Sequence, residues 1–168
     1  MSETISYILK SSSTQTLGAM ASILEKTKAH AAAAEVDEAV YLSARIFPDM
    51  LPLTRQVQIA CDTVARGAAR LAIKDVPSFP DTETTIDELI ARCHSALAFV
   101  NSIEDEAIDI NKRVTLEIPM GPNTMPMEGR QYLSSFVLPN LHFHAAIMYA
   151  LLRAQGVKIG KRDFLVPA

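Results

Sequence analysis

The chain has 168 residues, of which 49% are hydrophobic and 21% charged, and its formal net charge is −3. This length and composition predict one globular domain over residues 1–168, and the slight negative charge gives no basic face for a nucleic-acid partner. The two cysteines fit neither a zinc finger nor a disulfide framework, and the N-terminus lacks a signal-peptide pattern, which favours a cytoplasmic protein. No run of about 18 residues is free of charged or strongly polar groups, so we expect no membrane partner.

Two helices are predicted in the first half of the chain. Apolar residues recur at helical spacing over residues 5–24, and the alanines at 31–34 extend this first helix. Residues 35–51 include Pro48 and are interpreted as an ordered connection with room for one short helical turn, because the residue before a proline avoids helical geometry. A second helix begins near Pro52, since proline is tolerated in a first turn.

A third helix and a β-hairpin follow. Thr85 and Glu88 form a capping-box pattern, which predicts that the third helix begins there. Residues 112–118 alternate apolar and polar side chains, as in a half-buried strand, and residues 121–123 are typical of a turn. We therefore predict a short β-hairpin over residues 113–128.

The last helix is predicted to begin near Gly129 and to end at Gly156, where a left-handed cap is expected. Pro139 lies inside this helix and leaves the Ser135 carbonyl without its usual donor, so we expect a kink there. Four amphipathic helices that each bury one apolar stripe predict an all-α fold, an antiparallel four-helix bundle with the hairpin between the third and fourth helices.

Several polar side chains on these helices are candidates for a site. His144 falls on the apolar stripe of the last helix, and Asn140, four residues earlier, shares its face. His144 is either a core histidine satisfied by one polar partner or a ligand or acid–base residue inside the bundle. On the second helix, Gln58 and Asp62 share a face beside the apolar stripe, and they belong to a polar surface or reach the bundle mouth opposite His144.

Other sequence features point away from common enzyme classes. Cys61 and Cys93 lie on the apolar stripes of two helices and are predicted to be small buried side chains. The sequence contains no G-x-x-x-x-G-K-[ST], G-x-S-x-G, H-E-x-x-H or G-x-G-x-x-G motif. The common nucleotide-binding and hydrolase classes are therefore excluded, although other enzymes are not.

Three segments carry a resemblance to a known family. They are FPDMLPLTRQVQIACD (residues 47–62), FVLPNLHFHAAIMYALLRAQGV (136–157) and GKRDF (160–164). With them, the whole chain resembles an uncharacterised bacterial family of the DinB/YfiT-like superfamily. The resemblance implies a four-helix bundle whose better-known relatives hold a divalent metal with three histidines, one on the second helix and an H-x-x-x-H pair on the last. It also implies a homodimer, which small-residue faces at 31–34 and 67–69 favour as well.

The histidine positions of these relatives are only partly filled here. Aligned on the leucine–arginine step near the end of the last helix, the H-x-x-x-H pair falls on Asn140 and His144. The second helix has no histidine, so Gln58 or Asp62 would have to replace it. Because an amide oxygen is a weak ligand for zinc or nickel, we expect no firmly held metal. A divalent metal, if present, would use His144, Asn140 and Asp62.

Three functions follow from these observations. The first is binding of a small molecule in a polar pocket around His144, Asn140 and Tyr132, with Gln58 and Asp62 as further candidates. The second is a divalent-metal-dependent enzyme, of the thiol-transferase or hydrolase type that the resemblance implies, with an unusual ligand set. The third is a non-catalytic protein that acts as a homodimer through a helix face.

Overall fold

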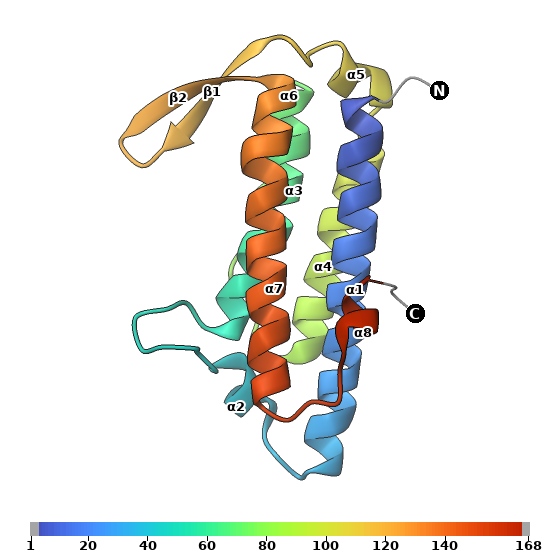
Figure 1. The fold of residues 1–168 in the computed structure, drawn as a ribbon, viewed down its shortest axis with the longest axis vertical. Helices are drawn as coiled ribbons and strands as arrows, with labels where there is room; N and C mark the ends of the chain where they lie inside the picture. Colours follow the sequence, from blue (N-terminus) through green and yellow to red (C-terminus); the bar gives the residue numbers. More distant parts are fainter. Residues whose placement is uncertain (1–3, 166–168) are drawn as a thin grey trace.

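Helices make up most of the protein, and the structure, a computed structural model, describes residues 4–165. In chain order the elements are α1 (Ile5–Ala33), α2 (Glu38–Leu42), α3 (Leu53–Leu71), α4 (Ile86–Ser102), α5 (Asp105–Asp109), β1 (Thr115–Met120), β2 (Asn123–Glu128), α6 (Gly129–Tyr132), the π-helical η1 (Leu133–Val137), α7 (Leu138–Ala154) and α8 (Lys161–Leu165). The long helices α1, α3, α4 and α7 lie side by side (Figure 1). The prediction of a mainly helical fold with one small antiparallel sheet is confirmed.

Local signals determine where several helices begin and end. The Thr4 side chain accepts a hydrogen bond from the backbone N–H of Tyr7 at 3.3 Å and caps α1. At the start of α4, the Thr85 hydroxyl accepts from the N–H of Glu88, and the Glu88 carboxylate accepts from the N–H of Thr85, as the predicted capping box requires. After α7, Gly156 has a φ of 90°, the left-handed conformation expected of a cap.

The helices α3 and α4 run in the same direction, which corrects the expectation of an antiparallel arrangement throughout. Both begin near α2, because Glu38 accepts from the N–H of Ile86 at 2.9 Å and Ala44 O accepts from the N–H of Leu53 at 3.0 Å. Residues 72–85, which we call the crossover segment, contain no helix or strand. Fourteen extended residues span up to about 46 Å, whereas a helix of the length of α3 spans roughly 28 Å. The segment can therefore return along the whole of α3.

The core lies between the four long helices, with the most extensive contacts between α1 and α4 and between α3 and α7. The largest fully buried side chains are Tyr132, Leu9, Leu17, Met20, Ile23, Leu24, Leu53, Leu71, Ile86, Leu89, Ile108 and Ile118. The small residues at 67–69 are also buried, and a Cβ atom on Gly67 would lie 3.0 Å from Val137 Cγ1. This small-residue face therefore packs within the chain, whereas residues 32–34 of the other face are exposed. The homodimer stays a prediction that rests on the resemblance and on the face at 31–34.

The last helix changes its hydrogen bonding near its middle. The elements α6, η1 and α7 follow without a break, and within η1 the bonds have π-helical spacing, so the N–H of Leu138 donates to Leu133 O. Pro139, which has no N–H to donate, comes directly after this turn. A π-helical turn thus replaces the simple kink that we expected, and such turns occur frequently at functional sites.

The same helix, Gly129–Ala154, is long and apolar enough to cross a membrane, with a mean hydropathy of 1.3 over its most apolar window. This finding differs from the expectation that polar and charged residues in every run of about 18 residues exclude a spanning helix. Its presence is weak support for a membrane protein, because a core helix of a globular protein meets the same criterion. Here the helix packs against α3 and α1 and buries Val137, Leu141 and Met148 in the core, so we interpret it as a core helix.

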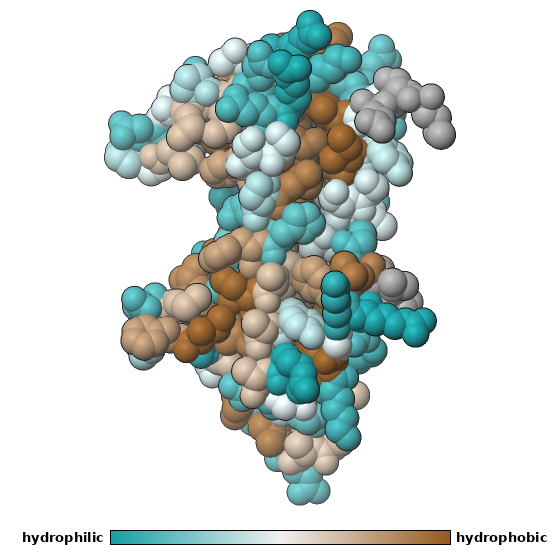
Figure 2. Space-filling view, in the orientation of Figure 1, coloured by the Kyte–Doolittle hydropathy of each residue, from teal (hydrophilic) through white to brown (hydrophobic). Residues whose placement is uncertain are grey.

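Two surface features lie at the end of the molecule where α6 begins. The hairpin projects to one side there (Figure 1), and its strands pair from Thr115 opposite Glu128 to Met120 opposite Asn123. Ile118 anchors the hairpin because its side chain is buried in the core. On the face shown in Figure 2, apolar side chains reach the surface between α1 and the start of the last helix. A groove there is lined by Ile5, Ile8, Leu133 and Leu138.

Candidate functional site

A cleft of about 320 Å³ lies between α3 and the last helix, and we call it the α3–α7 cleft. The polar side chains of its α3 wall are Arg55, Asp62, Thr63, Arg66 and Arg70. The opposite wall presents Tyr132, Phe136 and Asn140, which share one face of the helix because they are four residues apart. Pro119 of β1 and Asp81 of the crossover segment complete the lining. Two helices, the hairpin and the crossover thus contribute to one cavity.

The fold separates the five candidates chosen from the sequence. Asp62, Tyr132 and Asn140 line the cleft, although they come from distant parts of the chain. Gln58 is buried and does not line the cleft, and His144 is buried one turn beyond Asn140. The cleft is therefore lined by Asn140 and Tyr132 but not by His144, around which the sequence placed the pocket, and the ligand site stays a prediction.

Two hydrogen bonds join the walls of the cleft. Arg70 Nη1 donates to Tyr132 Oη at 3.1 Å, and Asn140 Nδ2 donates to Thr63 Oγ1 at 2.8 Å. Both hydroxyls act as acceptors in these bonds, so each keeps its own proton for a further partner. Tyr132 lines the cleft and is only 1% exposed, so packing holds its hydroxyl, which still has a proton to donate, in a fixed position.

His144 forms a buried pair with Gln56 of α3. Gln56 Nε2 donates to Leu51 O at 3.0 Å, which turns Gln56 Oε1 toward His144 Nδ1 at 2.7 Å. Because an amide oxygen only accepts, Nδ1 of His144 carries the proton. Burial lowers the pKa of His144 below its usual 6.5, so the imidazole is neutral at pH 7. This arrangement is that of a core histidine satisfied by one polar partner.

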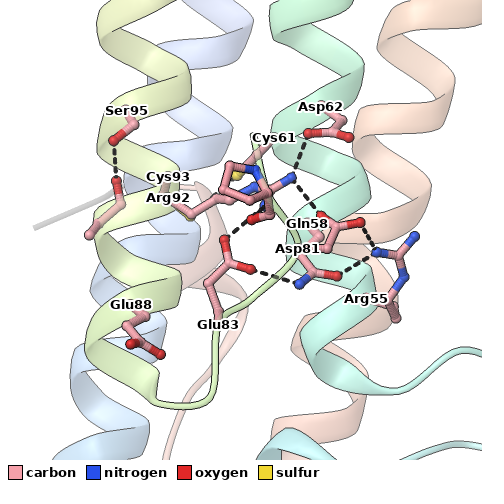
Figure 3. Close-up of polar contacts among 12 residues, drawn as sticks. Arg55, Gln58, Cys61, Asp62, Asp81, Glu83, Glu88, Arg92, Cys93 and Ser95 are labelled. Carbon is pink, nitrogen blue, oxygen red and sulfur yellow. Dashed lines mark hydrogen bonds and ion pairs between the residues drawn. The ribbon is translucent and has the colours of Figure 1, made fainter. Parts of the chain in front are cut away.

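Beside the cleft, Arg92 of α4 holds three carboxylates together (Figure 3). Its guanidinium nitrogens lie 2.6 Å from Asp62, 3.0 Å from Asp81 and 2.8 Å from Glu83, and its side chain is 2% exposed. Burial disfavours the charged form, but the bonds to Glu83 and Asp62 outweigh it and raise the pKa of Arg92. Because the crossover segment supplies two of the carboxylates, the parallel arrangement of α3 and α4 makes this cluster possible.

The cluster continues toward the start of α3 through Arg55 and Gln58. Arg55 pairs with Asp81 and donates to Gln58 Oε1 at 2.7 Å, and Gln58 Nε2 donates to Glu83 at 2.8 Å (Figure 3). Burial would raise the pKa of Asp81, but its two arginine partners lower it further than burial raises it. Gln58 therefore bridges an arginine and a carboxylate and is not part of a polar surface.

Asp62 connects this cluster to the cleft. Its Oδ1 atom contacts Arg92, and its Oδ2 atom pairs with Arg66 Nη2 at 2.8 Å. The Arg66 side chain is 48% exposed, whereas that of Asp62 is 16% exposed. One carboxylate is thus shared between a buried guanidinium and one that faces solvent.

The two cysteines meet between α3, which carries Cys61, and α4, which carries Cys93. Cys61 Sγ and Cys93 Sγ are 3.8 Å apart, and both side chains are buried (Figure 3). The hydrogen bond with Cys93 and burial together raise the pKa of Cys61 well above its usual value. Because the thiolate is the reactive form, Cys61 is a poor nucleophile in the folded protein.

We expect both thiols to react with a disulfide reagent such as DTNB much more slowly in native buffer than in denaturant. The matched control is Ser95→Cys, which places a thiol on the exposed face of the same helix as Cys93. That added thiol should react rapidly, and the other two only as the protein unfolds. Rapid modification of two thiols in the native wild-type protein would contradict this prediction.

Arg92 is not among the candidates chosen from the sequence, although its position carried a signal. Arg92 lies three residues after Leu89 and four before Ala96, so it occupies the buried stripe of α4. A charged residue at such a position needs partners. Its partners Asp81 and Glu83 lie in the crossover segment, where periodicity carries no information. A charged or polar residue on an apolar stripe therefore indicates a buried polar interaction.

The donor sets in the described structure do not resemble a metal centre. Among residues 4–165, no group of three or more His, Cys, Asp or Glu side chains is arranged to hold a metal ion. His144 and Asn140 each direct a nitrogen to a partner on α3, and both oxygens of Asp62 contact arginines. Asn140 and Asp62 are thus engaged in other interactions, and His144 is bonded through one of its two ring nitrogens.

Comparisons with known proteins agree with the resemblance noted from the sequence. Residues 8–165 match the family described as "Domain of unknown function (DUF1993)". A crystal structure of a DinB family member protein from Shewanella denitrificans is 34% identical, with a TM-score of 0.87, and the match covers 95% of this chain and 90% of that chain. None of the curated proteins matches this chain.

Proposed function

Since the chain belongs to the DUF1993 family of DinB-like proteins, we propose that it binds a small polar molecule in the α3–α7 cleft. One observation carries the proposal: Tyr132 and Thr63 offer hydroxyl protons to a cavity whose size is at the lower end of the range of ligand pockets. Packing alone does not require a buried tyrosine and an arginine to meet at a cavity. A ligand that accepts hydrogen bonds would bind the Tyr132 hydroxyl and the Arg70 guanidinium together.

We propose further that this cleft works without a resident zinc or nickel ion. The residues that would replace the relatives' histidines do not fit such an ion. The Asn140 amide nitrogen, a donor, is directed at Thr63, and His144, whose Nδ1–H faces Gln56, would supply a single imidazole ligand through Nε2. The Asp62 carboxylate would have to leave two arginines to bind a metal. Zinc and nickel sites need three or four free imidazole, thiolate or carboxylate ligands.

We also infer that the four long helices form a bundle of the DinB type, with the hairpin at its end as a wall of the cleft. The close structural likeness to the Shewanella protein over nearly the whole chain supports this. Within such a bundle, ligand sites are built from side chains on facing helices. The α3 and α7 residues of the cleft face each other in that way.

Blocking the cleft tests this function. Ile59 lines the cavity and is partly exposed, so Ile59→Trp should fill the cavity and leave the core intact. The matched control is Phe143→Trp, which places the same side chain at an exposed position of α7 outside the cleft. We expect fragments from a mixed library of acids, amines and neutral amides to bind the wild type and Phe143→Trp but not Ile59→Trp in ligand-observed NMR. Fragment binding that is the same in all three proteins would refute the proposal.

A further inference from the structure

The α3–α7 cleft has an excess of cationic side chains, and we propose that its ligand is a small organic anion. The oxyanion group, a carboxylate or a phosphate, is bound by Arg66 and Arg70 with the Tyr132 hydroxyl. This inference rests on the proposed function and narrows it to one class of molecule. Three arginines line the cavity against the two carboxylates of Asp62 and Asp81, whereas the whole chain has a net charge of −3.

Arg70 is the first of the two arginines that carry the inference. Its Nη1 atom donates to Tyr132 Oη, and among residues 4–165 no carboxylate lies within ion-pair distance of it. A guanidinium has five N–H donors, so most of those on Arg70 are left for a ligand. The Tyr132 hydroxyl accepts this bond in a residue that is 1% exposed, and its proton has no acceptor within the described part of the chain. Two adjacent donors of this kind match an oxyanion.

Arg66 is the second arginine that carries the inference, and it lies one helical turn from Arg70 on the same face of α3. Its one carboxylate partner within residues 4–165 is Asp62, which also neutralises the buried Arg92. The charge of Arg66 is therefore only partly balanced, and nearly half of its side chain is exposed. An incoming anion can pair with Arg66 without disturbing any buried group, because Asp62 remains bound to Arg92.

The apolar part of the lining indicates that the ligand is organic rather than a bare inorganic ion. Ile59 and Pro119 contribute hydrocarbon surface, and the ring of Phe136 stacks on that of Tyr132 with a centroid distance of 5.6 Å. Hydrocarbon or ring atoms of a ligand can pack against these side chains while its charged end reaches the arginines. The cavity of about 320 Å³ accommodates a molecule of this size.

Three probes of similar shape test the inference by ligand-observed NMR titration. Benzoate carries a carboxylate, phenyl phosphate carries a phosphate, and benzamide is a neutral analogue of benzoate. We expect at least one of the two anions to bind more tightly than benzamide and to lose affinity as NaCl is added. The anion that binds more tightly identifies the headgroup. Equal affinity for benzoate, phenyl phosphate and benzamide would overturn the inference.

Charge-removing variants locate the site. Arg66→Gln, at a half-exposed position, and Arg70→Gln should each weaken binding of the preferred anion about tenfold, as expected for the loss of a hydrogen bond between charged groups. The matched control is Arg153→Gln, an exposed arginine of α7 outside the cleft, which should leave the affinity unchanged. The inference is wrong if the two cleft variants bind the anion as the wild type does, or if Arg153→Gln weakens binding as much as they do.

Ile59→Trp separates the failure of this inference from the failure of the proposed function. If all three probes bind equally and all are lost in Ile59→Trp, the cleft binds small molecules without selecting anions, and only the inference fails. If the probes bind wild type and Ile59→Trp alike, or none binds at its solubility limit, both fail. Anion-selective binding that is lost in Ile59→Trp, Arg66→Gln and Arg70→Gln supports both.

Discussion

Arg92→Leu is expected to lower the free energy of unfolding by about 3–5 kcal/mol, the range measured when one partner of a buried ion pair is removed. Without the guanidinium, Asp62, Asp81 and Glu83 face one another, and the Glu83 side chain is only 9% exposed. The leucine replaces the volume of the arginine stem but none of its charge. The measurement is urea unfolding followed by far-UV circular dichroism.

The matched control for this prediction is Arg153→Leu, because Arg153 is exposed on α7. Surface substitutions of this kind usually change stability by less than about 0.5 kcal/mol. The loss of unfolding free energy for Arg92→Lys should lie between those of Arg92→Leu and Arg153→Leu. Lysine keeps the charge but cannot contact three carboxylates with a planar guanidinium. A loss below about 1 kcal/mol for Arg92→Leu would mean that the carboxylates find other partners or water, and that the cluster does not hold the crossover segment in place.

The helices of this protein could be predicted because their signals are local. The capping box at Thr85 and Glu88 and the glycine after α7 act within one turn of the chain, and the apolar stripes repeat every three or four residues. The direction in which α4 runs has no such local signal. It depends on whether the crossover segment turns back at once or continues along α3, and both paths are compatible with its prolines.

The candidate site shows the same limit. Tyr132 and Asn140 belong to one helix face, so their meeting at the cleft follows from helical spacing. Asp62 joins them because α3 packs against α7. The partner of His144 could not be derived in this way, because the sequence offers several polar residues on α3 and only the packing selects Gln56 over Gln58. The arginines of the cleft were missed because each, taken alone, is an ordinary polar residue of a helix surface.

His144→Ala is expected to lower the free energy of unfolding by about 2–4 kcal/mol, through the cavity it leaves and the unsatisfied oxygen of Gln56. The pair lies in the core, with His144 8% and Gln56 2% exposed. His142→Ala, on the exposed face two residues earlier, is the matched control and should have little effect. A double-mutant cycle of His144→Ala and Gln56→Ala should show that the two losses are coupled.

The dependence of this stability on pH distinguishes a neutral buried imidazole from a surface histidine. Because burial lowers the pKa of His144 below 6.5 in the folded protein, the unfolded state binds the proton more readily. The contribution of His144 to stability is therefore complete above pH 6.5 and decreases as the pH falls through and below that value. The difference in unfolding free energy between the wild type and His144→Ala should shrink from pH 7.5 to pH 5. A difference that grows toward low pH would mean that His144 is charged in the fold.

Metal content is the last readout of the same variant. In protein purified without chelators and without a metal-affinity column, we expect the zinc and nickel content of His144→Ala to equal that of the wild type. His144 would supply only one imidazole, and the other candidate ligands, Asn140 and Asp62, are paired with Thr63 and with two arginines. Stability would then change while metal content does not. Near-stoichiometric zinc or nickel in the wild type, lost in a His144→Ala protein that is still folded, would instead favour the metalloenzyme. In that case Asn140 and Asp62 would have to exchange their present partners, Thr63 and the two arginines, for the metal.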